Sequence, residues 1–233
     1  MIPKKIHYCW FGKNEKSELI KNCIESWKKY CSDCEIIEWN ESNFDVNQNI
    51  YTKEAYEKQK WAFVSDYARL WAVYNYGGIY LDTDVELIKN IDFVFDNENF
   101  FCYENDTYIN TGLGFGAVEK SKIVKEIMSD YDNIHFIQKN GKLDLTPCPQ
   151  RNTKILNNID KNLFVTYPKE MFNPIDYNTK VKNITDRTVA IHWYGSSWMT
   201  KKQKLERYIK NTIKNLLGDK IFQFIKRKLK KEI

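Results

Sequence analysis

Two carboxylates, Asp82 and Asp84, end a short apolar segment that begins after Gly77. We expect residues 79–85 to form a β-strand, in which Tyr80, Asp82 and Asp84 would share one face because side chains alternate between faces. The strand rise then separates the aspartates by about 6.6 Å at the backbone. They are close enough to converge on one hard divalent cation, one of them through water. The pattern indicates a metal-diphosphate site, and its alternative is a strand end at which two aspartates merely solvate a turn.

A helix is predicted to lead into this strand. It ends at Gly77 and Gly78. Asp66 and Arg69 are three residues apart and therefore neighbours on one flank of this helix. As a plain helix ion pair they would contribute only about 0.2–0.5 kcal/mol, but arginine is also the side chain best shaped to bind phosphate or sugar hydroxyls. The helix is recognised by apolar residues at helical spacing: Trp61, Val64, Ala68 and Trp71.

Three segments resemble a known family, the glycosyltransferases whose sugar-binding region contains an Asp-x-Asp motif. These segments are residues 2–12, residues 62–69 together with 77–84, and residues 192–198. The family includes bacterial capsule and lipopolysaccharide transferases and, more distantly, the clostridial glucosylating toxins. The resemblance covers residues 2 to about 200, and its middle segment is the most specific. It implies a GT-A fold, a Rossmann-like α/β fold with a mostly parallel sheet flanked by helices.

The hydrophobic pattern of the first 40 residues independently favours an α/β fold. A strand is expected at residues 5–10 and another at 35–39. Strands that alternate with helices favour a mostly parallel sheet covered on both faces. Ligands of such sheets bind beyond the carboxyl ends of the strands, where Trp10 and the two aspartates would lie. The helix between the two strands is expected to bury one face: Leu19, Ile20, Cys23, Ile24 and Trp27.

The resemblance assigns nucleotide-sugar contacts to particular residues. Trp10 would stack on the base, with Tyr8 at the edge of the same pocket, and a core position is the alternative for Trp10. Asp66, Arg69 and Asp82 would act in catalysis. The nucleotide-sugar contacts beyond Tyr8 and Trp10 would come from eight residues: Ser65, Asp66, Arg69, Tyr80, Asp82, Asn110, Ser197 and Trp198. For Asn110 a plain turn position is an equal alternative.

The resemblance also implies a divalent metal, Mn²⁺ or Mg²⁺. Asp84 would be the direct ligand, and Asp82 would bind the ion through water or touch the ribose. His192 follows a strand-like segment at 188–191, and it is equally a metal ligand or an ordinary histidine. Mg²⁺ and Mn²⁺ prefer oxygen ligands, and Mn²⁺ also accepts imidazole. Bound to both phosphates, the ion would neutralise the charge that develops on the leaving nucleoside diphosphate.

The expected activity is transfer of a hexose from a nucleotide-sugar, by resemblance a UDP-sugar, to a saccharide or glycolipid acceptor in surface polysaccharide synthesis. The resemblance implies retention of anomeric configuration through front-face substitution, and no Asp or Glu is a clear covalent nucleophile. One alternative is a haloacid-dehalogenase phosphatase, although Glu86 departs from that pattern. Another is a non-catalytic sugar-binding domain, which would not need Asp82, Asp84 and His192 together. Relatives often carry a Thr-Gly-Pro turn, whereas Thr146 directly precedes a proline here.

Composition predicts one globular domain. The chain has 233 residues, 42% hydrophobic and 15% aromatic, which excludes a disordered protein. We expect a GT-A domain at residues 1–200 and a basic amphipathic tail at 201–233. The N-terminus runs directly into a strand without a signal peptide, and no apolar run reaches membrane-spanning length, so a cytoplasmic protein is expected.

The tail carries twelve basic and three acidic residues, whereas the whole chain has a net charge of +5. Residues 205–217 are expected to pack on the domain. Residues 219–233 either pack in the same way or lie on the surface of an anionic membrane, with Ile221, Phe224 and Ile225 opposite the basic face. Nucleic-acid binding is not expected, because no recognition module accompanies the charge.

Overall fold

The computed structural model describes residues 1–177 and 179–195. Four predictions therefore lie outside the described residues. They are the contacts assigned to Ser197 and Trp198, the packing of residues 205–217 and the membrane helix at 219–233.

Strands and helices alternate through the first half of the chain. The predicted strands at 5–10 and 35–39 are confirmed, with bounds that differ by at most one residue. The α-helices are α1 Glu18–Tyr30, α2 Ile50–Glu57, α3 Trp61–Tyr76, α4 Lys122–Asp130, α5 Cys148–Leu156 and α6 Lys169–Phe172. The strands are β1 Lys5–Cys9, β2 Glu35–Trp39, β3 Gly78–Tyr80, β4 Val85–Leu87, β5 Asn99–Cys102, β6 Phe115–Ala117, β7 Val165–Tyr167 and β8 Ala190–His192. Short 3₁₀ helices are Asp92–Val94, Tyr131–Asn133 and Lys161–Leu163.

Six strands form the main sheet in the order β2-β1-β3-β6-β5-β7. Strand β1 pairs in parallel with β2 and β3, and β5 pairs in parallel with β7. Only β6 runs against its neighbours β3 and β5 in this sheet. The mostly parallel sheet expected from the sequence is therefore confirmed. Strands β4 and β8 form a separate antiparallel ribbon.

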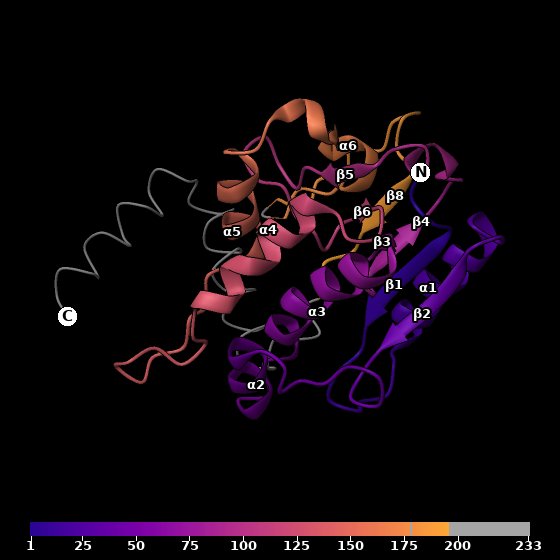
Figure 1. Ribbon diagram of the computed structural model, residues 1–233. Helices are drawn as coiled ribbons and strands as arrows, with labels where there is room; N and C mark the ends of the chain where they lie inside the picture. The colour runs from indigo at the N-terminus through magenta and orange to yellow at the C-terminus, as the bar shows by residue number, and fades with distance from the viewer. Residues whose placement is uncertain (178, 196–233) are drawn as a thin grey trace, which may run out of the picture. The chain divides into compact units, whose positions relative to one another are not determined.

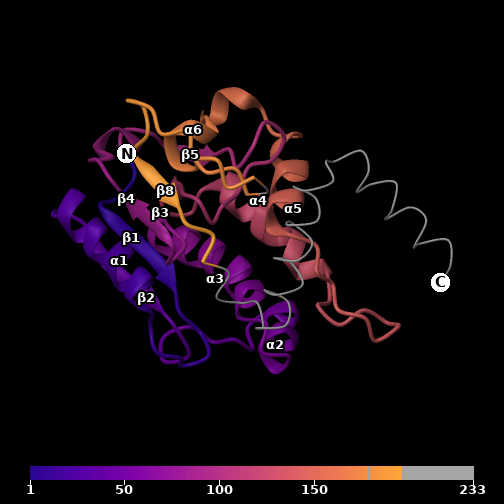
Figure 2. The same cartoon turned by 180° about the vertical axis from the view of Figure 1, so that it is seen from behind.

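Helices cover both faces of the main sheet (Figures 1 and 2). Helices α3 and α4 lie on one face, whereas α1 and the β4-β8 ribbon lie on the other. The buried side chains divide accordingly into two hydrophobic cores. Alternation along β1 illustrates the division, since Cys9 packs with the α3 core while Ile6 and Tyr8 pack with the α1 core.

Helix α3 ends where the sequence predicts. Gly77 adopts a positive φ of 59°, which glycine tolerates without a steric cost. Its amide donates to the carbonyl oxygen of Val73 at 2.9 Å and so closes the last turn. Within the described residues, no helix is long and apolar enough to cross a membrane.

The prediction of one strand through residues 79–85 is wrong. Strand β3 ends at Tyr80, and both aspartates lie in the connection to β4. The amide of Asp82 donates to the carbonyl oxygen of Gly112 at 2.8 Å. The amide of Val85 donates to the carbonyl oxygen of Asp82 at 3.0 Å. The backbone thus turns out of the main sheet, because β4 finds its partner in β8.

The face predicted for α1 is correct except at one position. Ile20, Cys23, Ile24 and Trp27 are buried, whereas Leu19 is 37% exposed. Leu19 lies in the first turn of the helix, where the core contacts begin only at the next residue.

Candidate active site

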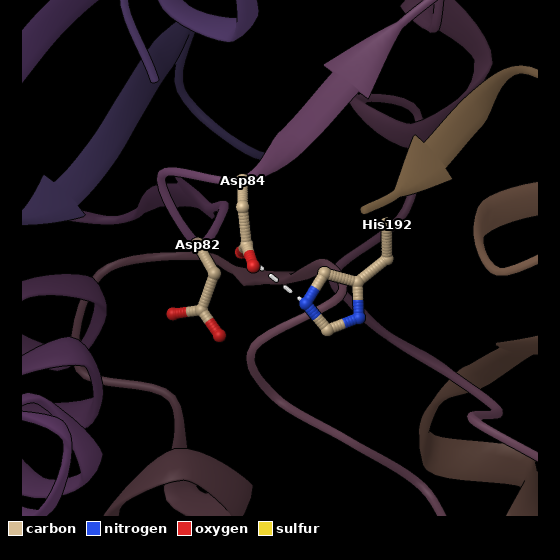
Figure 3. Close-up of side chains that lie close together, drawn as sticks. All are labelled: Asp82, Asp84 and His192. Atoms are coloured by element: carbon tan, nitrogen blue, oxygen red, sulfur yellow. Dashed lines mark ion pairs between the residues drawn. The ribbon is translucent and has the colours of Figure 1, made fainter. Parts of the chain in front are cut away.

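Asp82, Asp84 and His192 converge at one point of the structure. One potential ligand atom from each residue lies within 4.8 Å of those of the other two, and Figure 3 shows the three side chains facing one another. Pairing between β4 and β8 brings them together, because His192 is opposite Val85, the residue after Asp84. His192 Nε2 lies 3.2 Å from Asp84 Oδ1. Tertiary pairing therefore brings together the three residues that the sequence proposed as metal ligands, with Asp84 and His192 in direct contact.

The segment after β8 holds Asp84 in place. The amide of Gly195 donates to Asp84 Oδ2 at 2.7 Å, and the amide of Trp193 donates to the Asp84 carbonyl oxygen at 2.9 Å. Burial favours the neutral form of Asp84, but His192 and the Gly195 amide outweigh it and lower the pKa of the carboxyl. Burial likewise opposes the charge on His192, yet Asp84 raises its pKa above the ordinary value. Asp84 is thus held as a carboxylate.

Tyr194 supports the imidazole from the side. Its ring centroid lies 4.2 Å from that of His192. Its φ is 53°, a left-handed conformation that is rare for a bulky residue. Such strain persists where the surroundings fix the backbone, and it is concentrated at functional sites.

Arg69 connects the helix to the aspartates. Its Nη2 lies 3.2 Å from Asp66 Oδ1 and 3.2 Å from Asp82 Oδ1. The hydroxyl of Tyr80 also donates to Asp82 Oδ1 at 3.0 Å, and Arg69 lies over the Tyr80 ring at 4.9 Å. The helix ion pair between Asp66 and Arg69 that the sequence predicts is present, but it is buried, because the side chain of Arg69 is only 4% exposed and that of Asp66 10%. Burial raises the pKa of the Asp66 carboxyl, and the positive charge of Arg69, which lowers it, only partly offsets this effect.

Ser65 and Tyr80 form hydrogen bonds with other residues of the protein. The Ser65 hydroxyl donates to the carbonyl oxygen of Trp61 in its own helix, and the Ser65 carbonyl accepts from Arg69 Nε at 3.1 Å. Tyr80 is 1% exposed. Both residues therefore position Arg69 and Asp82, and the direct contacts to sugar or ribose predicted for them remain predictions.

Asn110 and Gly112 form a turn against Asp82. Asn110 is buried, and its Oδ1 accepts from the Gly112 amide at 2.7 Å, so the turn considered from the sequence is present. A Cβ atom at Gly112 would lie 2.1 Å from Asp82 Oδ2 and 3.0 Å from Arg69 Nη1. The site consequently requires glycine at this position. Sequence reasoning missed Gly112, because nothing local distinguishes it from an ordinary turn glycine.

Cys148 is a second residue that sequence reasoning missed. It is the first residue of α5, and its Sγ lies 3.8 Å from Arg69 Nη1 and 3.7 Å from Asn110 Oδ1. Burial raises the pKa of its thiol well above the ordinary range. The departure from the family pattern at residues 146–150 thus adjoins Arg69, and a neutral thiol lines the site there.

Trp10 lies at an open cavity of about 370 Å³ beyond the ends of β1 and β2. The cavity is also lined by Lys13, Glu38, Asn40, Glu41 and Ser42. The Trp10 indole N–H donates to the carbonyl oxygen of Asn14 at 2.7 Å, which fixes the ring. Tyr8 is buried, and its hydroxyl donates at 2.5 Å to Glu38, a residue that lines this cavity.

The donor set fits a divalent cation. Two carboxylates and one imidazole are ligands that Mn²⁺ accepts. His192 and Asp84 already lie in contact, and the ring nitrogen that faces the aspartates in Figure 3 is Nε2. An ion at this point would be held by Asp82, Asp84 and His192, and Asp82 also pairs with Arg69.

Comparison with known proteins agrees with this geometry. Residues 17–101 match the family model described as a glycosyltransferase sugar-binding region containing a DXD motif. The solved structure of the PaToxG glycosyltransferase superimposes with a TM-score of 0.50 at 20% identity, over 66% of this chain and 69% of that chain. A glycosyltransferase involved in the glycosylation of the major capsid of PBCV-1 superimposes with a TM-score of 0.51 at 12% identity, over 90% of this chain and 100% of that chain. No curated protein matches the sequence.

The matched region includes α3, with Asp66 and Arg69, and both aspartates of the Asp-x-Asp motif. The structural likenesses establish the fold, a mostly parallel α/β sheet of the GT-A type. The matches to a glycosyltransferase family model and to glycosyltransferase structures favour a transferase over the phosphatase and the non-catalytic sugar-binding domain considered from the sequence. The chain is a glycosyltransferase with the GT-A fold, and its residues 17–101 match the family whose sugar-binding region contains a DXD motif.

Proposed function

We propose that the protein transfers a hexose from a UDP-sugar to a saccharide or glycolipid acceptor, with Mn²⁺ at Asp82, Asp84 and His192. The convergence of these three side chains beside Arg69 carries the proposal. When bound, Mn²⁺ neutralises negative charge on the diphosphate as a Lewis acid. The guanidinium of Arg69 is positioned by Asp66 and Asp82 to bind the donor sugar or phosphate.

The cavity at Trp10 supports the placement of the nucleoside. Strands β2, β1 and β3 are adjacent and parallel, so their carboxyl ends lie at one edge of the sheet. Two strand spacings separate β2 from β3 by roughly 10 Å, a span that a ribose and a diphosphate can bridge. In this arrangement the base stacks on Trp10 and the phosphates reach Asp82 and Asp84.

Retention of anomeric configuration is part of the proposal. Its support is that Asp66, the buried carboxylate beside the DXD motif, is engaged by Arg69 and is not free to attack a sugar. Front-face substitution requires no protein nucleophile. Proton NMR of the product formed from an α-linked donor tests this part, and a β-linked product contradicts it.

A screen of UDP- and GDP-hexoses tests the donor and the metal together. Nucleotide release is measured with Mn²⁺, with Mg²⁺ and with EDTA, and Asp84→Asn is measured in parallel. We expect release from a UDP-hexose that requires Mn²⁺ and is absent in the variant. Release from GDP-sugars alone contradicts the UDP assignment, and release that persists in EDTA contradicts the metal assignment.

We further propose that the protein works in surface polysaccharide synthesis at the cytoplasmic face of an anionic membrane, and that residues 219–233 provide the attachment. The support is the sequence of this segment, with basic residues opposite Ile221, Phe224 and Ile225. Each basic residue near an anionic surface contributes about 1 kcal/mol. Co-sedimentation with phosphatidylglycerol vesicles should be salt-sensitive and should disappear when residues 219–233 are deleted. Unchanged binding by the truncated protein contradicts the proposal.

A further inference from the structure

Glu104 is a partly buried carboxylate that the proposed donor site does not use. It follows β5 by two residues and so lies beyond the carboxyl end of that strand. Its backbone is fixed at both ends, since its amide donates to the Tyr108 carbonyl oxygen at 2.7 Å and its carbonyl accepts from Asn173 Nδ2 at 2.9 Å. Its side chain interacts with the side chain of Asn110 and with the charge of His192. The carboxylate therefore lies at the Asn110 turn, near enough to His192 to be influenced by its charge.

No cation is dedicated to this carboxylate in the part of the chain that the structure describes. The positive group that acts on it is His192, whose Nε2 is already paired with Asp84 at 3.2 Å. Removing a carboxylate from water is costly unless hydrogen bonds compensate for the lost hydration. A ligand that donates hydrogen bonds would supply the missing compensation.

Asn173 provides a second, independent sign of an absent ligand. It is 4% exposed, and its Nδ2 donates to the backbone carbonyl oxygen of Glu104 at 2.9 Å and to the Tyr194 hydroxyl at 2.6 Å. Its Oδ1 is buried and has no hydrogen-bond partner. Buried polar atoms in native proteins almost always have partners. Glu104 and Asn173 thus offer acceptors for donor groups, which is the pattern that the hydroxyls of a saccharide require.

Asn110 separates this acceptor pair from the donor-sugar residues. Its Oδ1 is directed to the Gly112 amide and to Cys148 Sγ, on the side of Arg69. A carboxylate accepts hydrogen bonds, so the interaction of Asn110 with Glu104 uses the Nδ2 donor of the amide. Asn110 therefore links the neighbours of Arg69 to Glu104.

We propose that Glu104 and Asn173 bind the saccharide acceptor, with the Glu104 carboxylate accepting a hydrogen bond from an acceptor hydroxyl. This inference rests on the proposed transferase function. In the transfer step the acceptor oxygen bonds to the anomeric carbon, the bond from that carbon to the β-phosphate oxygen breaks, and the hydroxyl proton passes to the departing phosphate. Glu104 remains a carboxylate throughout, so it orients the acceptor and keeps no proton.

Comparison of two reactions of the same enzyme tests the proposal. The UDP-hexose that the protein hydrolyses with Mn²⁺ is the donor, and the methyl glycosides of glucose, galactose and mannose are the acceptor probes. We expect Glu104→Gln to leave hydrolysis within about twofold, because water needs no orientation by Glu104, and to raise the KM of the best glycoside at least about tenfold. The matched control is Asp106→Asn, an exposed carboxylate two residues along, paired with Lys169. It should change neither reaction.

The outcomes separate failure of this inference from failure of the proposed function. If Glu104→Gln leaves the glycoside KM unchanged, or lowers hydrolysis and transfer equally, Glu104 does not bind the acceptor. If the unmodified protein shows no Mn²⁺-dependent thermal shift with UDP, the proposed function itself fails. Saturation-transfer NMR of the same glycosides, with UDP and Mn²⁺ present, measures acceptor binding without turnover. Equal saturation in the unmodified protein and in Glu104→Gln overturns the inference.

Discussion

Gly112 fits against Asp82 so closely that no side chain can replace its hydrogen. Its carbonyl oxygen accepts from the Asp82 amide at 2.8 Å, while a Cβ at Gly112 would lie 2.1 Å from Asp82 Oδ2. The backbone and the side chain of the first DXD aspartate are therefore both set by a residue that precedes β6. This relationship explains how a turn, rather than a strand, can hold Asp82 in one position.

Gly112→Ala should displace Asp82 and lower kcat by about 100-fold, the scale expected for a misplacement of roughly 1 Å. Activity on the UDP-hexose substrate and the melting temperature are measured together. Gly141→Ala is the control, because a Cβ at Gly141 meets nothing within 4 Å although its φ of 77° strains alanine. It should lower stability without a loss of activity. Full activity in Gly112→Ala would show that Asp82 does not need this position.

Asp84→Asn should abolish Mn²⁺-dependent binding of UDP. Asparagine retains an oxygen for the Gly195 amide, so the local backbone stays in place, but the charge that pairs with His192 is lost. The loss should exceed the roughly 10- to 100-fold that removal of a ligand's hydrogen-bond partner causes. Calorimetric titration of UDP with and without Mn²⁺ measures it. Affinity for Mn²⁺-UDP equal to that of the unmodified protein contradicts the metal site.

Arg69→Lys should lower kcat/KM strongly, although the positive charge is kept. Lysine cannot reach Asp66 and Asp82 while also donating to the Ser65 carbonyl oxygen, as the guanidinium does. Loss of about 2–3 kcal/mol from charged hydrogen bonds corresponds to roughly 30- to 150-fold in kcat/KM.

Arg187→Lys is the matched control for this change. Arg187 pairs with Glu170 at 3.0 Å but its side chain is 64% exposed, so the substitution should be nearly neutral. If the two substitutions changed kcat/KM equally, the assignment of Arg69 to the active site would be contradicted.

His7 should make the protein less stable in acid. Its ring is fully buried between the Trp39 indole N–H, 3.1 Å from Nδ1, and the Gly77 carbonyl oxygen, 2.7 Å from Nε2. This arrangement holds a neutral ring with the proton on Nε2. Burial lowers its pKa from 6.5 to about 4.

The unfolded chain therefore binds more protons than the folded protein between pH 6.5 and 4. The contribution of His7 is complete above pH 6.5 and falls by about 3 kcal/mol as the pH drops to 4. Urea unfolding of the unmodified protein and of His7→Gln across this range measures it, with the exposed His135→Gln as control. Identical pH slopes for the unmodified protein and His7→Gln would contradict the assignment.

Local sequence determined the elements that carry the site. The apolar period and the two glycines predicted α3 and its end, and the alternation of strands and helices predicted the mostly parallel sheet. These features depend on interactions between residues close in the chain, which periodicity records directly. The same patterns, together with the family resemblance, singled out Asp82, Asp84, Arg69 and His192 before any distance was known.

Tertiary structure alone decided how those residues meet. Pairing of β4 with β8 ended the predicted strand early and brought His192 to Asp84, and packing of α3 against the sheet buried the Asp66-Arg69 pair. The positions of Gly112 and Glu104 became apparent only from their neighbours. Sequence periodicity cannot supply such contacts, because they join segments far apart in the chain whose approach is set by the packing of the whole domain.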